Sequence, residues 1–375
     1  MHAPQQKQHG SFLSAVLLLL LAVGPLCAQI ATPNRVLDLD GKDSYVNLPA
    51  GIFDELTEAT VEMWARWENM GQSSTLFDYG EDNREMVIGQ IGDGPNLRFQ
   101  IIYRGALVFS GFEVNDLLRL KEWCHIAAVS GRGGMALYFN GVLVGRNELP
   151  ESFATIPKGK NHLLGRNTGM SRLPAALPLF HGQLDEIRVW KVRRTPEQIR
   201  ENMFKSLAGT EPGLAGLWNF ESVENGVVKD ATPAAHHGRL IGNARVVSAS
   251  ARSLDGASPI RTFAGTVRDP AGKLMTNAVV TVLSGMNELT AGTTDGNGRF
   301  ALACRVPSAE SVDLRVVSVS GDYCVWLLDQ KPGAGESEHN VTLTPGSTVR
   351  GRVRAFDNSG IRNVVVQLID AGAPR

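Results

Sequence analysis

The chain has 375 residues, which is enough for two domains and the start of a third. Its 37 Lys and Arg residues nearly balance 38 Asp and Glu residues, and no segment is a basic run. Neither a nucleic-acid partner nor a polybasic membrane contact is therefore indicated. Glycine is abundant, with 40 residues, and short strand-like runs outnumber helical ones, which is typical of an all-β protein.

The N-terminal segment is typical of an export signal. Residues 12–23, FLSAVLLLLLAV, form an uncharged apolar run that is short for a transmembrane helix. Gly24-Pro25 ends this run, and Leu26-Cys27-Ala28 offers a cleavage site with Ala28 at the −1 position. We interpret residues 1–28 as a signal peptide, with an uncleaved anchor as the alternative. This predicts a secreted or cell-envelope protein that is not inserted in the membrane after cleavage.

A first domain is expected over residues 35–248, as a succession of strands separated by Gly, Asp, Asn and Pro. The clearest hairpin has MALYF and VLVG on either side of Asn140-Gly141, a pair that favours a two-residue type I′ turn. The clearest helix begins at Thr195-Pro196-Glu197-Gln198, where Thr195 can cap and Gln198 can complete a capping box. This short helix could cover a sheet edge or Trp190.

The run FHGQLDEIRVW, residues 180–190, is a predicted strand with an acidic residue at an apolar position. Strand alternation puts Asp185 on the same face as Ile187 and Val189. A carboxylate on a core-facing side must be paired with a cation, hydrogen-bonded or bound to a metal. The partner of Asp185 is therefore the main functional question that the sequence raises.

Several aromatic side chains could stack on sugars, and the alternative for most of them is packing in the core. In the strand ATVEMWARWE, residues 59–68, alternation places Trp64 on the outer face. The candidates are Trp64, Trp123, Trp190, Tyr79 and Tyr103.

The first domain resembles the LamG-like jelly-roll domains, which are concanavalin A-like sandwiches. The residues that carry the resemblance occur in the family's order, from LDLDGKDSYV at 37–46 through WCHIA at 123–127 and LYFNG at 137–141 to GQLDEIRVW at 182–190. The closing LWNF at 217–220 fits as well. The resemblance implies a calcium ion at the rim of the sandwich, for which Asp40, Asp43 and Asp185 are the expected ligands. The alternative is that Asp185 pairs with an arginine or with backbone N–H groups.

A second domain is expected over residues 261–345, after a linker at 249–260 that is rich in small and polar residues. GTVRD at 265–269 and TTDGNGRF at 293–300 resemble the carboxypeptidase regulatory-like domain, a small transthyretin-like Greek-key β-sandwich. GRVR at 351–354 and NVVV at 363–366 repeat the spacing of GTVR at 265–268 and NAVV at 277–280. Residues 346–375 are thus interpreted as an incomplete second repeat, either the start of further modules or a stub that pairs with the preceding domain.

Three cysteines remain once Cys27 is removed with the signal, so at most one disulfide is expected. Cys304 and Cys324 lie in neighbouring strand-like runs of the second domain and could pair. Cys124 is expected to be a small buried hydrophobic residue.

The sequence predicts an exported, modular, non-catalytic binding or adhesion protein with an all-β fold, a jelly roll followed by a smaller sandwich. The first domain would bind a glycan or an extracellular protein, and the second would act as a spacer. HExxH, GxSxG, P-loop and E-x-D-x-x-E motifs are absent from the sequence. The alternatives are the accessory region of a larger secreted hydrolase, either a glycosidase or a peptidase, and a purely structural surface protein.

Overall fold

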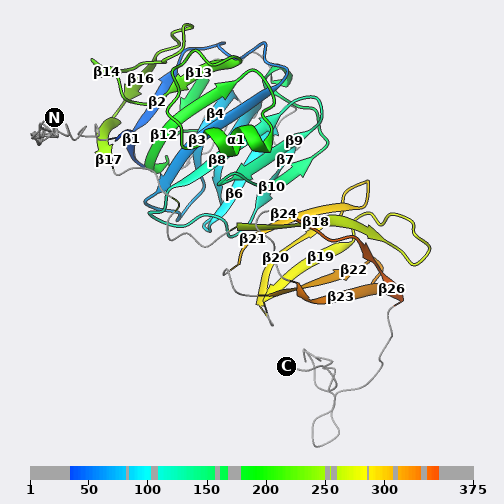
Figure 1. The fold of residues 1–375 in the computed structure, drawn as a ribbon. Coiled ribbons are helices and arrows are strands. Elements are labelled where there is room, and N and C mark those ends of the chain that lie inside the picture. The colour runs from blue at the N-terminus through cyan, green and yellow to red at the C-terminus, as the bar shows by residue number, and fades with distance from the viewer. Residues whose placement is uncertain are drawn as a thin grey trace, which may run out of the picture. The chain divides into compact units, whose positions relative to one another are not determined.

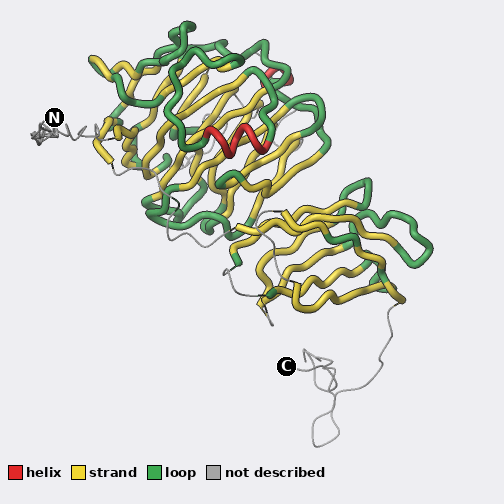
Figure 2. Tube along the Cα trace, in the orientation of Figure 1, coloured by secondary structure: helices red, strands yellow, loops and turns green. Residues whose placement is uncertain are grey.

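The computed structural model describes residues 34–81, 84–102, 109–156, 161–167, 179–249, 254, 260–284, 287–306, 311–330 and 336–345. The predicted signal peptide and the predicted incomplete repeat lie outside these ranges. The described chain is almost entirely β-structure, which confirms the predicted fold class (Figures 1 and 2). None of its helices is both long and apolar enough to cross a bilayer.

The first sandwich contains two antiparallel sheets (Figure 1). The eight-stranded sheet consists of β1 (Asn34–Asp40), β3 (Ala59–Trp67), β8 (Cys124–Ser130), β9 (Met135–Phe139), β10 (Val142–Asn147), β12 (His181–Trp190), β13 (Leu214–Trp218) and β17 (Arg245–Ala249). Its order is β10-β9-β8-β3-β12-β1-β17, with β13 also paired to β12. Strands that are far apart in the sequence are therefore neighbours, as expected for a jelly roll.

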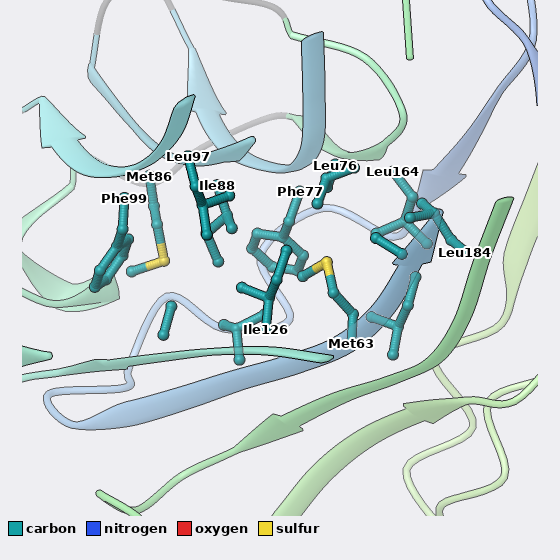
Figure 3. Close-up of a cluster of buried hydrophobic side chains, with 14 of the residues drawn as sticks. Met63, Leu76, Phe77, Met86, Ile88, Leu97, Phe99, Ile126, Leu164 and Leu184 are labelled. Carbon is teal, nitrogen blue, oxygen red and sulfur yellow. The ribbon is translucent and has the colours of Figure 1, made fainter. Parts of the chain in front are cut away.

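The second sheet of this sandwich has nine strands in the order β14-β15-β16-β2-β11-β4-β5-β6-β7. They are β2 (Tyr45–Leu48), β4 (Ser74–Glu81), β5 (Arg84–Ile91), β6 (Asn96–Ile102), β7 (Phe109–Val114), β11 (Asn161–Leu164), β14 (Val223–Glu224), β15 (Val227–Val228) and β16 (Gly238–Ile241). The inner faces of the two sheets meet in one apolar core, which Figure 3 shows in part. Met63 and Ile126 contribute to it from one sheet, and Phe77 and Phe99 from the other.

The predicted alternation in β12 is wrong at its centre. The register of β12 against β3 shifts between Asp185 and Arg188, and Glu186 adopts a φ of +49° there. This β-bulge adds one residue to β12, so Leu184 and Ile187 both reach the core. Asp185 therefore does not share the core face with Ile187, and Glu186 and Arg188 belong to the outer face with it.

The predicted hairpin and helix are both found. Asn140 and Gly141 connect β9 to β10 with φ values of +51° and +76°, as a type I′ turn requires. Helix α1 (Pro196–Asn202) is capped by Thr195, whose side chain accepts from the backbone N–H of Gln198, and the reciprocal bond completes the capping box. A 3₁₀ turn, η1 (Phe153–Thr155), precedes β11.

The second sandwich has a five-stranded sheet and a four-stranded sheet. The five-stranded sheet, in the order β20-β19-β22-β23-β26, consists of β19 (Val279–Ser284), β20 (Asn287–Thr293), β22 (Val312–Val317), β23 (Tyr323–Gln330) and β26 (Thr344–Pro345). The other consists of β18 (Ile260–Arg268), β21 (Arg299–Arg305), β24 (Glu336–Glu338) and β25 (Val341–Thr342). A separate apolar cluster that includes Phe263, Val280 and Leu314 forms its core.

The expected disulfide between Cys304 and Cys324 is not present. Cys304 lies in β21 and Cys324 in β23, so the two residues belong to different sheets of the second sandwich. Cys304, Cys324 and Cys124 are all free thiols, and Cys124 is buried as predicted. The sequence suggested neighbouring strands because the two runs are close along the chain, but the sandwich topology separates them.

Candidate functional site

A cleft of about 410 Å³ lies at one end of the first sandwich. Three chain segments meet there: the turn that follows β1, the loop between β3 and β4, and the segment that leads into β12. The lining residues are Asp40, Gly41, Lys42, Asn69, Gly71, Gln72, Ser74, Leu179 and His181. We call this the rim cleft. Only one of its lining residues, Asp40, is among the site residues predicted from the sequence.

The turn after β1 is shaped by Asp40 and Gly41. The Oδ1 atom of Asp40 accepts from the backbone N–H of Lys42 at 2.9 Å and from the Oγ hydroxyl of Ser44 at 2.6 Å, which closes the turn locally. Gly41 has a φ of +71°, and a Cβ on it would lie 2.7 Å from the Cβ of His181. Only glycine therefore lets this turn lie against the first residue of β12.

Asp40 is a carboxylate held in its ionised form. Partial burial alone would raise its pKa, but the hydrogen bonds from Ser44, Lys42, Asn243 and Asp43 outweigh this effect and hold the pKa far below the usual range. The two oxygens share these donors, since Oδ2 accepts from the side-chain amide of Asn243 at 3.1 Å. Asp40 is therefore poorly suited to give or take a proton near neutral pH.

Asp43 lies beside Asp40, and Asn243 joins the two. The backbone N–H of Asn243 donates to Oδ1 of Asp43 at 3.1 Å, while its side chain donates to Asp40. The preceding Gly242 has a φ of +61°, and a Cβ on it would lie 2.4 Å from the carbonyl oxygen of Asp43. The structure thus brings together two of the three acidic residues that the sequence analysis assigned to calcium.

Asp185 is not part of this group. Asp40 pairs with His181 in the β1–β12 register, and Asp185 lies four residues further along β12, about 13 Å at the usual strand rise. Its Oδ2 atom accepts from the Asn34 amide at 2.9 Å, and its Oδ1 atom accepts from the backbone N–H of Glu186 at 2.8 Å. Hydrogen bonding to an amide and to backbone thus accompanies the burial of Asp185.

The fit of these residues to a calcium ion is limited. Calcium takes six to eight oxygen ligands, whereas the oxygens of Asp40 accept from N–H and O–H donors. In the described ranges, no group of three or more His, Cys, Asp or Glu side chains is arranged to hold a metal. Calcium binding by Asp40 and Asp43 stays a prediction.

Three other polar side chains of the rim cleft, those of Lys42, Gln72 and His181, can reach a ligand. Lys42, Asn69, Gln72 and His181 are exposed, and the side chains of Lys42, Gln72 and His181 have no hydrogen-bond partner within the described part of the chain. Together they offer an ammonium, an amide and an imidazole group. Asn69 and Gln72 lie in a loop that carries no motif, whereas Lys42 and His181 lie in recognised segments that gave no sign of a ligand role. His181 lies next to Asp40 because of the register between β1 and β12, which the sequence does not reveal.

The aromatic residues proposed for sugar stacking are buried. Trp64 and Tyr79 are completely inaccessible, and Trp123 and Trp190 are 8% and 5% exposed. Trp64 does lie on the outer face of its sheet, as predicted, but Phe204 packs over it with the ring centroids 5.2 Å apart. The packing alternative therefore holds for these four residues. Tyr103 lies outside the described residues.

Two antiparallel sheets of eight and nine strands around one apolar core define the first sandwich as a lectin-like jelly roll. Residues 40–200 match the family model described as the concanavalin A-like lectin/glucanases superfamily. This confirms the resemblance predicted for the first domain. No curated protein matches the chain.

Solved structures show the same kind of likeness at low identity. A candidate carbohydrate-binding protein from Bacteroides ovatus is 17% identical with a TM-score of 0.44, covering 58% of this chain and 60% of that protein. The chain thus spans less than two thirds of the length of that protein. A heptameric pentraxin from Limulus polyphemus is 17% identical with a TM-score of 0.35, covering 45% of this chain and 81% of the other. The CBM40 module of a Ruminococcus gnavus sialidase, bound to sialyllactose, is 11% identical with a TM-score of 0.37, covering 45% of this chain and 97% of that module.

Proposed function

We propose that the first sandwich is a glycan-binding domain and that the rim cleft is its binding site. The observation that carries this proposal is the cleft itself, which is about 410 Å³ in volume and is lined by the side chains of Lys42, Gln72 and His181, which have no hydrogen-bond partner among the described residues. Small-ligand sites combine such a concave surface with a few convergent polar groups that fix the orientation of the ligand. Sugar hydroxyls both donate and accept, so the Gln72 amide and the His181 imidazole are suitable partners for them.

We further propose that the domain binds its ligand without catalysis. Among the described residues that line the cleft, the carboxylate is that of Asp40, which is held ionised by four hydrogen bonds, whereas a general acid needs a pKa near the working pH. Incubating the protein with soluble polysaccharides should therefore release no new reducing ends. Release of reducing ends that Asp40→Asn abolishes would contradict this part of the proposal.

The role of the second sandwich in the proposal is that of a spacer. Its GTVRD and TTDGNGRF segments support an assignment as a carboxypeptidase regulatory-like module, and its small separate core suits such a unit. The apolar run at residues 12–23 and the site after Ala28 support export, so the expected location is outside the cell or on its envelope. Fractionation of the native host would test the location.

A glycan array probed with residues 29–375 tests the binding proposal directly. We expect binding to a restricted set of glycans, which Lys42→Ala and His181→Ala each weaken about tenfold by removing one polar contact of about 1.4 kcal/mol. Lys191→Ala is the matched control, because Lys191 is also an exposed lysine of this domain but does not line the cleft. Absence of binding to any glycan would favour a structural role or a protein ligand.

Calcium binding by Asp40 and Asp43 is a separate proposal with its own test. Repeating the array with a chelator should abolish binding if the ion organises the cleft, and isothermal titration with calcium should show one site that Asp43→Asn removes. Asp269→Asn is the matched control, because Asp269 also accepts backbone N–H groups in a tight turn of the second sandwich. Unchanged binding in chelator, with no heat of calcium binding, would remove calcium and leave the glycan proposal intact.

A further inference from the structure

The outer face of the eight-stranded sheet carries an ionic cluster that is almost completely dry. Glu62 on β3 is 0% exposed, and its Oε1 atom lies 2.8 Å from Nη1 of Arg194. Its Oε2 atom lies 3.9 Å from Nη1 of Arg188 and 3.5 Å from Nε2 of His125. Glu186 completes the group through a 2.7 Å ion pair with Arg188. We call these five residues the outer-face cluster.

The cluster lies under residues 194–205, which contain helix α1 and which we call the strap. Arg188 donates to the backbone carbonyls of Asn202 at 2.9 Å and Lys205 at 2.5 Å, at and just after the end of the helix. Arg194 donates to the carbonyl of Gln198 at 3.0 Å. The Arg188 guanidinium at the helix C-terminus also faces the negative end of the helix dipole. Arg188 thus fastens the strap to the sheet from β12, and Arg194 fastens it through its ion pair with Glu62 on β3.

Trp64 adds a further attachment of the strap. Its indole Nε1 donates to the backbone carbonyl of Met203 at 2.8 Å, and the Phe204 ring packs against it. Ile199 of α1 is buried in a small apolar cluster with Ala127 and Val129 on the outer face of β8. The strap is therefore held by a few carbonyl contacts and a small apolar patch, outside the main core.

His125 is the one member of the cluster whose charge changes between pH 5 and 8 in water. It is 1% exposed, and its Nδ1 atom has no hydrogen-bond partner within the described residues. Glu62 faces it from β3, Arg188 faces it from β12 and Arg194 faces it from the strap. The Trp64 ring covers it edge-on with a centroid distance of 5.4 Å.

We propose that the strap is an acid-sensitive latch, in which a proton on His125 loosens residues 194–205 from the outer face of the sheet. An imidazolium in this dry site would lack a partner for Nδ1–H and would lie beside two guanidinium groups. It gains water only when the strap lifts, because the strap and Trp64 cover it. Opening would expose Trp64, Glu62 and Arg188 to solvent while the two-sheet core stays closed.

The direction of the pH dependence follows from the environment of His125. Burial lowers its pKa, and Arg188 and Arg194 lower it further, while Glu62 acts in the opposite direction without overcoming burial. Glu62 itself has a lowered pKa despite its burial, because His125, Arg194 and Arg188 stabilise its charged form. The folded pKa of His125 is thus below the solvent value of about 6.5. The contribution of neutral His125 to the stability of the attached strap is therefore complete above pH 6.5 and decreases as the pH falls below that value.

Hydrogen exchange measured by mass spectrometry on the whole chain tests this proposal. Exchange of peptides covering 195–205 is compared at pH 7.5 and pH 5.0, after correction for the intrinsic pH dependence with the unfolded chain. We expect the opening equilibrium of the strap to increase about tenfold at pH 5.0, with peptides of β8 and β3 unchanged. An unchanged strap, or an equal increase throughout the domain, would overturn the proposal.

The variant His125→Gln identifies the responsible residue. Glutamine keeps an N–H donor near Glu62 but cannot take a proton, so strap exchange should no longer depend on pH. His162→Gln is the matched control, since His162 is also buried with a lowered pKa but lies in the other sheet. If His125→Gln does not fold, carbon-13 NMR titration of the wild-type histidines replaces it. A His125 resonance that titrates together with strap opening supports the latch, and one that does not change contradicts it.

Discussion

The outer-face cluster and the rim cleft each hold an ionised carboxylate, but they do so by different means. Glu62 is completely buried and is neutralised by the guanidinium groups of Arg194 and Arg188. Asp40 is only partly covered and is held by backbone N–H groups, a hydroxyl and an amide. In the cluster the charged side chains form ion pairs with one another. At the rim, small neutral donors satisfy Asp40, and the side chains of Lys42 and His181 have no partner among the residues that the structure describes, so they can meet a ligand.

This comparison separates structural charge from functional charge within one domain. A buried ion pair costs several kcal/mol of desolvation for each ion, which its partners must offset. An exposed charge costs little and is available to other molecules. Mutations in the two regions should therefore act on different quantities, stability for the outer-face cluster and binding for the rim cleft.

The largest expected effect is from Glu62→Ala. Removing this carboxylate leaves Arg194 without its ion-pair partner in a dry site, which should lower the free energy of unfolding by about 3–5 kcal/mol. Urea denaturation followed by circular dichroism measures this change. Glu68→Ala is the control, because the Glu68–Arg66 pair is partly exposed and should contribute less than about 1 kcal/mol. Similar losses of unfolding free energy for both variants would contradict the distinction between buried and exposed ion pairs.

A second effect comes from the buried histidine of the core. Burial lowers the pKa of His162 to about 4, with Asp54 opposing the shift weakly, and its Nε2 atom accepts from the backbone N–H of Gly51 at 2.8 Å. Because the folded pKa lies below the unfolded value of about 6.5, the related stability is complete above pH 6.5 and is lost as the pH falls towards 4. The loss should reach about 3 kcal/mol at pH 4.

Urea titrations of the wild type and His162→Gln between pH 7 and pH 4 measure this effect, and the variant should lack most of the decline. His181→Gln provides the comparison with the rim, since His181 is exposed at the start of β12. An equal decline in the wild type and His162→Gln would show that other groups control the acid sensitivity.

The sequence was informative wherever a short motif determines local geometry. The capping box at Thr195 and the Asn140-Gly141 turn both depend on residues within four positions of each other. It failed where the geometry depends on a distant partner. The bulge at Glu186 places Asp185 on the outer face of the sheet and not on the core face. No local residue pattern predicts a φ of +49° at this glutamate.

The candidate site was only partly predictable for the same reason. Asp40 was found through its motif, whereas Asn69, Gln72 and His181 reach the cleft only through the pairing of β1 with β12 and β3 with β12. The predicted disulfide between Cys304 and Cys324 was wrong because runs that are close in the sequence were assumed to form neighbouring strands. In a sandwich, consecutive strands can belong to opposite sheets, as β21 and β22 do here.

A third, smaller effect is expected from Trp64→Phe, which tests how the strap is attached. An aromatic ring is kept, although phenyl is smaller than indole, and the hydrogen bond from the indole to the carbonyl of Met203 is lost. Since that carbonyl acceptor is largely shielded, the free energy of unfolding should fall by about 1–3 kcal/mol. Hydrogen exchange should show that the loss is concentrated in residues 194–205. A uniform loss over the first sandwich would indicate that the strap is an inseparable part of the core.

The smallest expected effect is at the rim, from Ser44→Ala. The Ser44 hydroxyl donates to Oδ1 of Asp40 and accepts from the Asp40 backbone N–H at 2.7 Å, while Lys42 and Asn243 still donate to the Asp40 carboxylate when the hydroxyl is removed. The free energy of unfolding should therefore fall by only about 0.5–1.5 kcal/mol at pH 7. Asp40 has a lowered pKa, so its stabilising effect is present above about pH 3.8 and is lost in stronger acid.

The same variant distinguishes a structural role of this turn from a binding role. Ser44→Ala removes a donor that stabilises ionised Asp40, so the dependence of stability on pH below 4 should become shallower than in the wild type. Glycan affinity should change along with it, because Asp40, Gly41 and Lys42 of the same turn line the cleft. A stability change of the expected size with unchanged glycan affinity would mean that the turn supports the sheet but not the ligand, and the binding site would then lie on the β3–β4 side of the cleft.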